Sequence, residues 1–209
     1  MLDNKETVYI LEDDEAIIHA LEWLFDSVQL KYCVFTDSEK FLKEYQTSWH
    51  GCILMDIRMP KMSGIRVQEE LNAQNNKLPI LFITGHGDIA TAVRTMKAGA
   101  FDFITKPFHN ETLLEQVQKA IAQSRRENSS MCEKENFNSL LHILSARERQ
   151  ILAYIQEGKL NKQIAVELNL SLSTIELHRA NVMKKLHVKS LADLIKKMTL
   201  FQIDCKAPA

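Results

Sequence analysis

Residues 52–64 read CILMDIRMPKMSG, and this stretch decides the class of fold. Its first four residues, Cys52–Met55, form an apolar run of strand length, and Asp56 ends that run. The same pattern opens the chain, where the apolar run Val8–Leu11 is followed by two acidic residues. Similar runs, rich in β-branched or aromatic residues, predict five strands over 8–11, 32–35, 52–55, 80–83 and 101–104.

Amphipathic segments alternate with these runs. In the first of them, Leu21, Leu24, Phe25 and Val28 recur at helical spacing. Alternating strands and helices predict a parallel sheet with helices on both faces, and right-handed crossovers restrict the topology to a doubly wound α/β fold. The predicted helices cover 15–28, 38–46, 64–74, 89–98 and 110–124.

Length and composition limit the class of protein and the number of domains. The chain has 209 residues and a mass of 24.0 kDa, with 45% apolar and 25% charged residues, which is typical of a globular protein with two domains. This composition argues against disorder, collagen and coiled coil. No run reaches the length of a membrane span, and the N-terminus does not resemble a secretion signal. The four cysteines are far apart and form no CxxC motif, so we expect a cytoplasmic protein with reduced thiols.

The net charge of −1 hides an asymmetry along the chain. Residues 1–123 hold 12 Lys and Arg against 18 Asp and Glu, whereas residues 139–209 hold 11 against 6. The basic second half could meet a polyanion. Between the halves, 124–139 is polar without an apolar period and is predicted to be a linker, into which the preceding helix could run. We therefore predict domains over 1–123 and 140–203, with a short tail over 204–209.

Acids, a hydroxyl and an amine fall at the carboxyl ends of the predicted strands. Glu12 and Asp13 follow the first strand, Asp56 follows the third, Thr84 ends the fourth and Lys106 follows the fifth. In a doubly wound sheet, ligands bind at this edge. Clustered carboxylates repel one another unless a cation lies between them, and Mg²⁺ or Mn²⁺ suits such oxygen ligands. One carboxylate could then accept a phosphoryl group; the alternative is a chance row of surface acids.

Residues 140–200 carry no strand signal. Helices are predicted over 146–157, 162–168, 174–187 and 190–200, and Gly158 is placed to end the first of them. Ser145…Glu148 and Ser173…Glu176 both have the form of a capping box. Glu176 could instead accept a hydrogen bond from a cytosine amine.

The segment 174–187 presents two different faces when it is arranged as a helix. Ile175, Val182 and Leu186 share a stripe that fits a core, and the other face mixes an amide, a cation and small or apolar side chains, which suits reading base edges in a major groove. The three-residue turn over 169–171 is typical of a DNA-binding helix-turn-helix, and the alternative is a basic helical bundle that contacts protein. The candidate DNA-contacting residues are Lys162, Ser173, Thr174, Glu176, Leu177, His178, Ala180, Asn181 and Lys184, with Arg179, Lys185 and Lys189 as further candidates for phosphate contacts.

Four motifs surround the predicted acidic site: ILEDDE (10–15), MDIRMPKMSG (55–64), ITGHGD (83–88) and FDFITKPF (101–108). Together they resemble the receiver domain of two-component response regulators over all of 1–123. The resemblance implies a flavodoxin-like fold with a five-stranded parallel sheet and a partner histidine kinase that phosphorylates Asp56. It also implies that Mg²⁺ is ligated by Asp13, Asp56, the main-chain carbonyl of Arg58 and, through water, Glu12, that Thr84 and Lys106 bind the phosphoryl group, and that Phe103 is the switch aromatic.

Further expectations follow from the same resemblance. The Lys106–Pro107 peptide is expected to be cis, and Gly64 is expected to supply a turn with unusual dihedrals. His86 lies where the family tunes the lifetime of the phosphoryl group, or it is a loop residue with local hydrogen bonds. The motifs imply no substrate pocket, so we expect a regulator with only metal-dependent phosphoryl acceptance and slow self-dephosphorylation, and not an enzyme.

The segments 144–152, 158–165 and 173–186 are similar to the LuxR-type helix-turn-helix, and 178–183 resembles the FixJ branch of these regulators. The resemblance implies a transcription regulator in which phosphorylation controls dimerisation and binding to double-stranded DNA at an inverted repeat. RNA polymerase is a further candidate partner. The alternative is a phosphorelay module whose C-terminal domain contacts protein. The last helix carries Leu191, Leu194, Ile195 and Met198 at helical spacing, and one side of it must cover its own domain. In the family this helix also forms a dimer seam, which these four residues would carry here.

Overall fold

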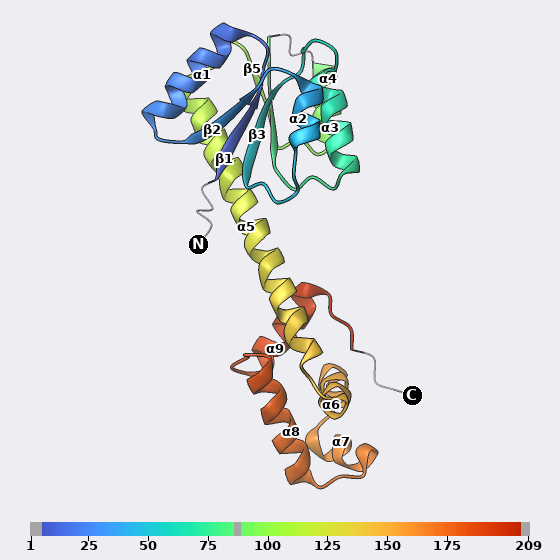
Figure 1. The fold of residues 1–209 in the computed structure, drawn as a ribbon. Coiled ribbons are helices and arrows are strands. Elements are labelled where there is room, and N and C mark those ends of the chain that lie inside the picture. Colours follow the sequence, from blue (N-terminus) through green and yellow to red (C-terminus); the bar gives the residue numbers. More distant parts are fainter. Residues whose placement is uncertain (1–5, 86–88, 206–209) are drawn as a thin grey trace. The chain divides into compact units, whose positions relative to one another are not determined.

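The computed structural model describes residues 6–85 and 89–205, which form two compact units, one up to residue 128 and one from residue 129 (Figure 1). The first unit confirms the predicted α/β fold, and its strands and its first four helices lie within two residues of their predicted bounds. In chain order, its elements are β1 (Thr7–Leu11), α1 (Glu15–Ser27), β2 (Lys31–Phe35), α2 (Ser38–Glu44), β3 (Gly51–Asp56), α3 (Gly64–Ala73), β4 (Ile80–Thr84), α4 (Ile89–Lys97), β5 (Asp102–Thr105) and the first part of α5 (Asn110–His142).

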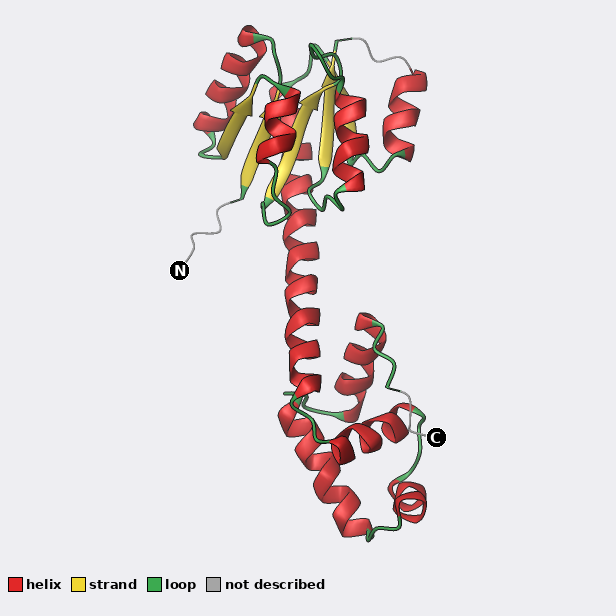
Figure 2. Ribbon diagram, turned by 45° about the vertical axis from the view of Figure 1, so that its right-hand side comes forward, coloured by secondary structure: helices red, strands yellow, loops and turns green. Residues whose placement is uncertain are grey.

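The sheet is wholly parallel, with strand order β2-β1-β3-β4-β5. Helices α1 and α5 cover one face and α2, α3 and α4 cover the other, so that the sheet lies between two helical layers (Figures 1 and 2). The register pairs Leu11 with Met55, which brings the carboxyl ends of β1 and β3 side by side. Residues that directly follow these two strands therefore meet at one edge of the sheet.

Both faces of the sheet are buried, which explains why the strands appear in the sequence as continuous apolar runs. Successive side chains alternate between two cores. Leu11 and Met55 pack with α2 and α3, whereas Ile10 and Leu54 pack with α1 and α5. The helix α1 begins at a cap formed by Asp14, whose carboxylate accepts hydrogen bonds from two backbone N–H groups of the first turn.

Helix α5 runs to His142, through the whole of the predicted linker. The stretch 124–139 contains no glycine or proline and is rich in Glu, Lys, Arg and Asn, so nothing in it stops a helix. Because the stretch 124–139 contains few apolar residues, hydrophobic periodicity does not indicate the helix. Near its end Phe137 is buried in the core of the second unit, so part of the predicted linker belongs to that unit.

The second unit adds α6 (Ala146–Gln156), α7 (Asn161–Leu168), α8 (Leu172–Lys185) and α9 (Leu191–Phe201). The capping box of Ser145 and Glu148 is confirmed, and Gly158 ends α6 with a φ of 77°. The Ser173…Glu176 box is wrong. Ser171 caps α8 by accepting from the N–H of Thr174, so the helix begins two residues earlier than expected. Among the described residues, no helix is long and apolar enough to cross a bilayer.

Candidate functional site

An acidic cluster occupies the edge of the sheet where β1 and β3 end. Asp56 is the last residue of β3 and is buried, Glu12 follows β1 and is fully buried, and Asp13 is exposed. Carboxylate oxygens of these three residues lie within 4.8 Å of one another. The prediction that the strand ends bring these three acids to one edge of the sheet is thus confirmed, and the pairing of Leu11 with Met55 is the physical reason.

Lys106 lies inside the cluster. Its Nζ donates to Glu12 at 2.6 Å and to Asp56 at 3.1 Å. Its backbone N–H donates to the carbonyl of Thr84 at 2.8 Å, which fixes the end of β5 beside the end of β4. Burial raises the pKa of the Glu12 carboxyl, against the opposing effect of Lys106. Burial by itself would lower the pKa of Lys106, but its hydrogen bonds and charge contacts with Glu12 and Asp56 outweigh burial and raise it.

The donor set suits a hard divalent cation. Three carboxylates converge, and the two buried ones, Glu12 and Asp56, share Lys106 as their one cationic partner among the described residues. Oxygen ligands of this kind are those that Mg²⁺ and Mn²⁺ prefer. The N–H of Arg58 donates to an oxygen of Asp56 at 3.3 Å, and this bond orients the carboxylate at the start of the following loop.

The loop after β3 passes very close to the start of α3. A Cβ at Gly64 would lie 2.3 Å from the carbonyl oxygen of Asp56. Gly64 does not have a positive φ, so the expectation of unusual dihedrals is wrong, and close backbone approach is what requires glycine here. The glycine therefore keeps the Asp56 backbone in place.

Two further predicted residues border the cluster. Thr84 is buried at the end of β4, and Phe103, on β5, is half-buried against the core on the α2–α3 side of the sheet. The cis peptide between Lys106 and Pro107 is confirmed. His86 lies outside the described residues.

The predicted recognition helix is α8. Its stripe Ile175, Val182 and Leu186 is buried, as predicted. Its other face is open, and Leu177 has 61% of its surface exposed. Because Ser171 supplies the cap, Glu176 has no capping role and stays on the exposed face. Lys162, Ala180 and Lys184 are also exposed, Asn181 is half-buried, and the hydroxyls of Ser173 and Thr174 lie within hydrogen-bond distance of Ser171.

Three cationic or titratable side chains of α8 are turned away from the expected DNA face. Lys185 donates to Glu148 of α6 at 2.7 Å, so it ties two helices together and does not extend toward phosphate. Nδ1 of His178 is buried and has no hydrogen-bond partner within the described part of the chain, which favours packing over base reading. Arg179 is half-buried beside a pocket. Sequence reasoning missed the Glu148–Lys185 pair because a capping residue is not expected to reach a second helix.

The predicted dimer seam on α9 needs correction. Leu194 and Met198 are buried in the core of their own unit, with exposed fractions of 0% and 2%. Ile195 packs partly against the same core. Of the four, Leu191 is exposed and Ile195 is half-buried, because most of the apolar stripe of α9 packs in the core of its own unit.

Comparison with known proteins decides the family. Residues 8–118 match the model of the response regulator receiver domain, and residues 142–198 match that of the bacterial regulatory proteins of the luxR family.

The chain is a two-component response regulator.

TodT, a response regulator from Pseudomonas putida, is 43% identical over 200 residues, which are 94% of this chain and 86% of TodT. The transcriptional regulatory protein FixJ from Bradyrhizobium diazoefficiens is 37% identical over 93% of this chain and 95% of its own. The solved structure of the response regulator StyR is 38% identical, covers 93% of this chain and 98% of that one, and superposes with a TM-score of 0.82. The response regulator thus combines a receiver with a LuxR-type DNA-binding domain and is similar to the FixJ branch of transcription regulators.

Proposed function

We propose that Asp56 accepts a phosphoryl group from a partner histidine kinase and that this modification controls dimerisation and DNA binding. The main observation that supports this proposal is the position of Asp56. Its carboxylate shares Lys106 with Glu12 and lies within a group of three carboxylates fit for a divalent cation. An oxygen of Asp56 forms the new bond to phosphorus as the bond from phosphorus to the kinase histidine nitrogen breaks.

Residues of the chain then hold the product. Lys106, already 3.1 Å from Asp56, neutralises charge on the phosphoryl oxygens, and the hydroxyl of Thr84 binds one of them. Asp13, Asp56, the Arg58 carbonyl and, through water, Glu12 would hold Mg²⁺ or Mn²⁺, which would supply positive charge to the phosphoryl oxygens. Movement of Thr84 toward the phosphoryl group leaves room for Phe103 to turn, and the surface of α4 and β5 changes with it.

The C-terminal domain turns this change into transcriptional control. Helix α8 enters the major groove of an inverted-repeat operator, and each subunit of a dimer reads one half-site. Leu191, exposed at the start of α9, belongs to the surface available to a second subunit. RNA polymerase is a candidate partner once the dimer is on DNA. The proposal places the protein in the cytoplasm, because DNA and the phosphorylated domain of the kinase are met there.

Intact mass spectrometry tests the central step. Wild-type protein, incubated with acetyl phosphate and Mg²⁺, is expected to gain about 80 Da, whereas Asp56→Asn is expected to gain nothing. Asp14→Asn is the matched control, because Asp14 is an exposed acid beside the cluster whose capping role asparagine can keep. An adduct of equal yield on Asp56→Asn would overturn the proposal. Unchanged DNA affinity and oligomeric state after phosphorylation would overturn only the proposal that phosphorylation controls dimerisation and DNA binding.

A further inference from the structure

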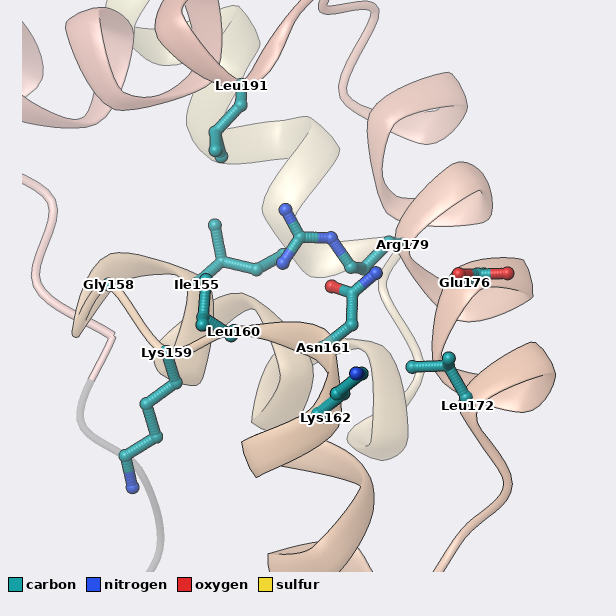
Figure 3. A pocket seen from close by; sticks show the side chains of 10 residues that line it. All are labelled: Ile155, Gly158, Lys159, Leu160, Asn161, Lys162, Leu172, Glu176, Arg179 and Leu191. Carbon is teal, nitrogen blue, oxygen red and sulfur yellow. The ribbon is translucent and has the colours of Figure 1, made fainter.

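The C-terminal unit contains a pocket of about 560 Å³ beside helix α8. It lies between the end of α6, the start of α7, one side of α8 and the start of α9 (Figure 3). We call it the side pocket and define it by Leu160, Lys162, Leu172, Arg179 and Leu191 of its lining. The lining also includes Lys159 and one acidic residue, Glu176, so its formal charge is positive.

Three leucines give the side pocket an open apolar rim. Leu160, Leu172 and Leu191 have exposed fractions of 70%, 40% and 46%. Leu160 occupies the N-cap position of α7, where serine, threonine or aspartate is usual, and it provides no side-chain acceptor to the helix. The local fold therefore does not explain leucine at this position, but apolar contact with a partner does.

The side pocket also carries unpaired positive charge. Figure 3 shows the guanidinium of Arg179 reaching into the pocket between Ile155 and Asn161. Within 6–85 and 89–205, no hydrogen bond or ion pair reaches Arg179, and its partial burial lowers its pKa. Lys162 is likewise without an ion pair among the described residues, whereas Lys159 is neutralised by Glu157 and Glu167. A half-buried guanidinium with five unused donors is a ready partner for a carboxylate.

The geometry of α8 separates this charge from the DNA face. At about 100° per residue, Arg179 lies roughly 130° around the helix axis from the centre of the face formed by residues 176, 177, 180, 181 and 184. Arg179 instead lies on the same side of α8 as Leu172, seven residues earlier, at the edge of the core. The guanidinium of Arg179 therefore lies off the DNA face, although two candidate DNA contacts, Lys162 and Glu176, also line the side pocket.

We propose that the side pocket binds an acidic, leucine-bearing segment of a partner protein. A carboxylate of that segment pairs with Arg179 and Lys162, and an aliphatic side chain rests against the three exposed leucines. Charge complementarity selects an acidic occupant, and the apolar rim selects protein over the phosphate backbone of DNA. The proposal does not depend on phosphorylation of Asp56, so it stands or falls separately from the proposed function.

The test uses the full chain and a fluorescein-labelled, 12-residue synthetic helical peptide with two leucines four residues apart and Glu or Asp elsewhere. Fluorescence anisotropy at physiological salt measures its Kd. A twin peptide with Gln and Asn in place of the acids is expected to bind about tenfold more weakly, because it loses the charge-assisted hydrogen bonds. Arg179→Gln and Leu160→Asp are each expected to raise the Kd of the acidic peptide about tenfold. Lys196→Gln removes an exposed cation of α9 outside the pocket and is expected to leave the Kd within about twofold.

Any one of five results would overturn the proposal. Equal Kd values for wild type and Arg179→Gln, or for the acidic and neutral peptides, would remove the basis for an acidic occupant. A loss of DNA affinity by Arg179→Gln as large as that by Lys184→Gln would assign Arg179 to DNA phosphate. Self-association that Arg179→Gln abolishes in analytical ultracentrifugation would assign the pocket to a second copy. A lower unfolding midpoint for Arg179→Gln would assign the guanidinium a structural role, since an unpaired, partly desolvated charge should cost nothing to remove.

Discussion

The ion pair between Glu148 and Lys185 holds the recognition helix, and two substitutions at Glu148 separate its contributions. The Glu148 carboxylate accepts from the backbone N–H of Ser145 and from Nζ of Lys185, both at 2.7 Å. Glutamine keeps the capping box but removes the charge, whereas alanine removes both. Glu148 is buried and Lys185 is 38% exposed, so the ion pair is partly screened by solvent.

The magnitudes follow from these contacts. We expect Glu148→Gln to cost about 1 kcal/mol, near the upper end for a partly exposed pair. Glu148→Ala should cost about 2 kcal/mol, because it also leaves the Ser145 N–H without an acceptor. For a unit of this size, about 1 kcal/mol lowers the unfolding midpoint by about 4–8 °C. Alanine should therefore lower the midpoint about twice as far as glutamine.

Circular dichroism of the full chain is the assay, read beside tryptophan fluorescence. Both tryptophans, Trp23 and Trp49, lie in the first unit, so their fluorescence follows that unit alone and serves as the internal control. The helical signal should show the second unit melting earlier in both Glu148 variants while the tryptophan transition stays fixed. Equal midpoints for wild type and both variants would refute the assigned role of Glu148.

The same pair gives a pH dependence with a defined sign. The hydrogen bond and charge of Lys185 lower the pKa of Glu148 in the folded state, against the opposing effect of burial. The folded pKa then lies below the unfolded value of about 4.3. The stabilisation is therefore present above the unfolded pKa and lost as the pH falls through the folded pKa. The gap between wild type and Glu148→Gln should close on acidification, and a gap that persists at the lowest pH would contradict this account.

Three further outcomes test the fold and the site. Gly64→Ala should destabilise the first unit by about 2 kcal/mol in denaturant titrations followed by tryptophan fluorescence, because the added Cβ meets a carbonyl oxygen at 2.3 Å; unchanged stability would show that the loop can yield. Leu194→Ala should cost about 2–5 kcal/mol in thermal melts, whereas Leu191→Ala should stay within about 0.5 kcal/mol, and the reverse order would restore the α9 seam as first expected. Burial raises the pKa of the Cys52 thiol to about 12, so a disulfide reagent should label the two exposed cysteines of the native protein and reach Cys52 only on unfolding.

The receiver could be predicted almost completely from the sequence because its information is local. Each strand is an apolar run closed by a polar residue, and parallel strands place their carboxyl ends at one edge. The identity of the residues at these ends, such as Asp56 and Lys106, therefore already fixes their proximity. The sequence does not predict that Lys106 bridges Glu12 and Asp56, because these hydrogen bonds depend on side-chain positions within the site.

The errors lie where two local signals compete or where tertiary packing decides. Ser171 and Ser173 both suit the N-cap of α8, and only the first meets the N–H of Thr174. The apolar stripe of α9 fits a dimer seam or a core equally well, and the packing of α6 and α8 selects the core. The helix through 124–139 lacks apolar periodicity because most of its side chains are exposed, so only the absence of a stop signal could have indicated it.

The positive charge of the C-terminal half serves several purposes, and this limits how the domain can recognise DNA. Lys185 is tied to Glu148, Lys159 is held by two glutamates, and Arg179 turns into the side pocket. Among the described residues, Lys162, Lys184 and Lys189 are exposed and form no ion pair, so they stay available for the predicted phosphate contacts. We expect discrimination between sequences to come from the uncharged or weakly polar side chains of the exposed α8 face, whose hydrogen bonds and methyl contacts would depend on base identity. Because the Glu148–Lys185 bond joins α6 to α8, we expect its loss to shift this face and to change DNA binding even though neither residue is expected to contact DNA.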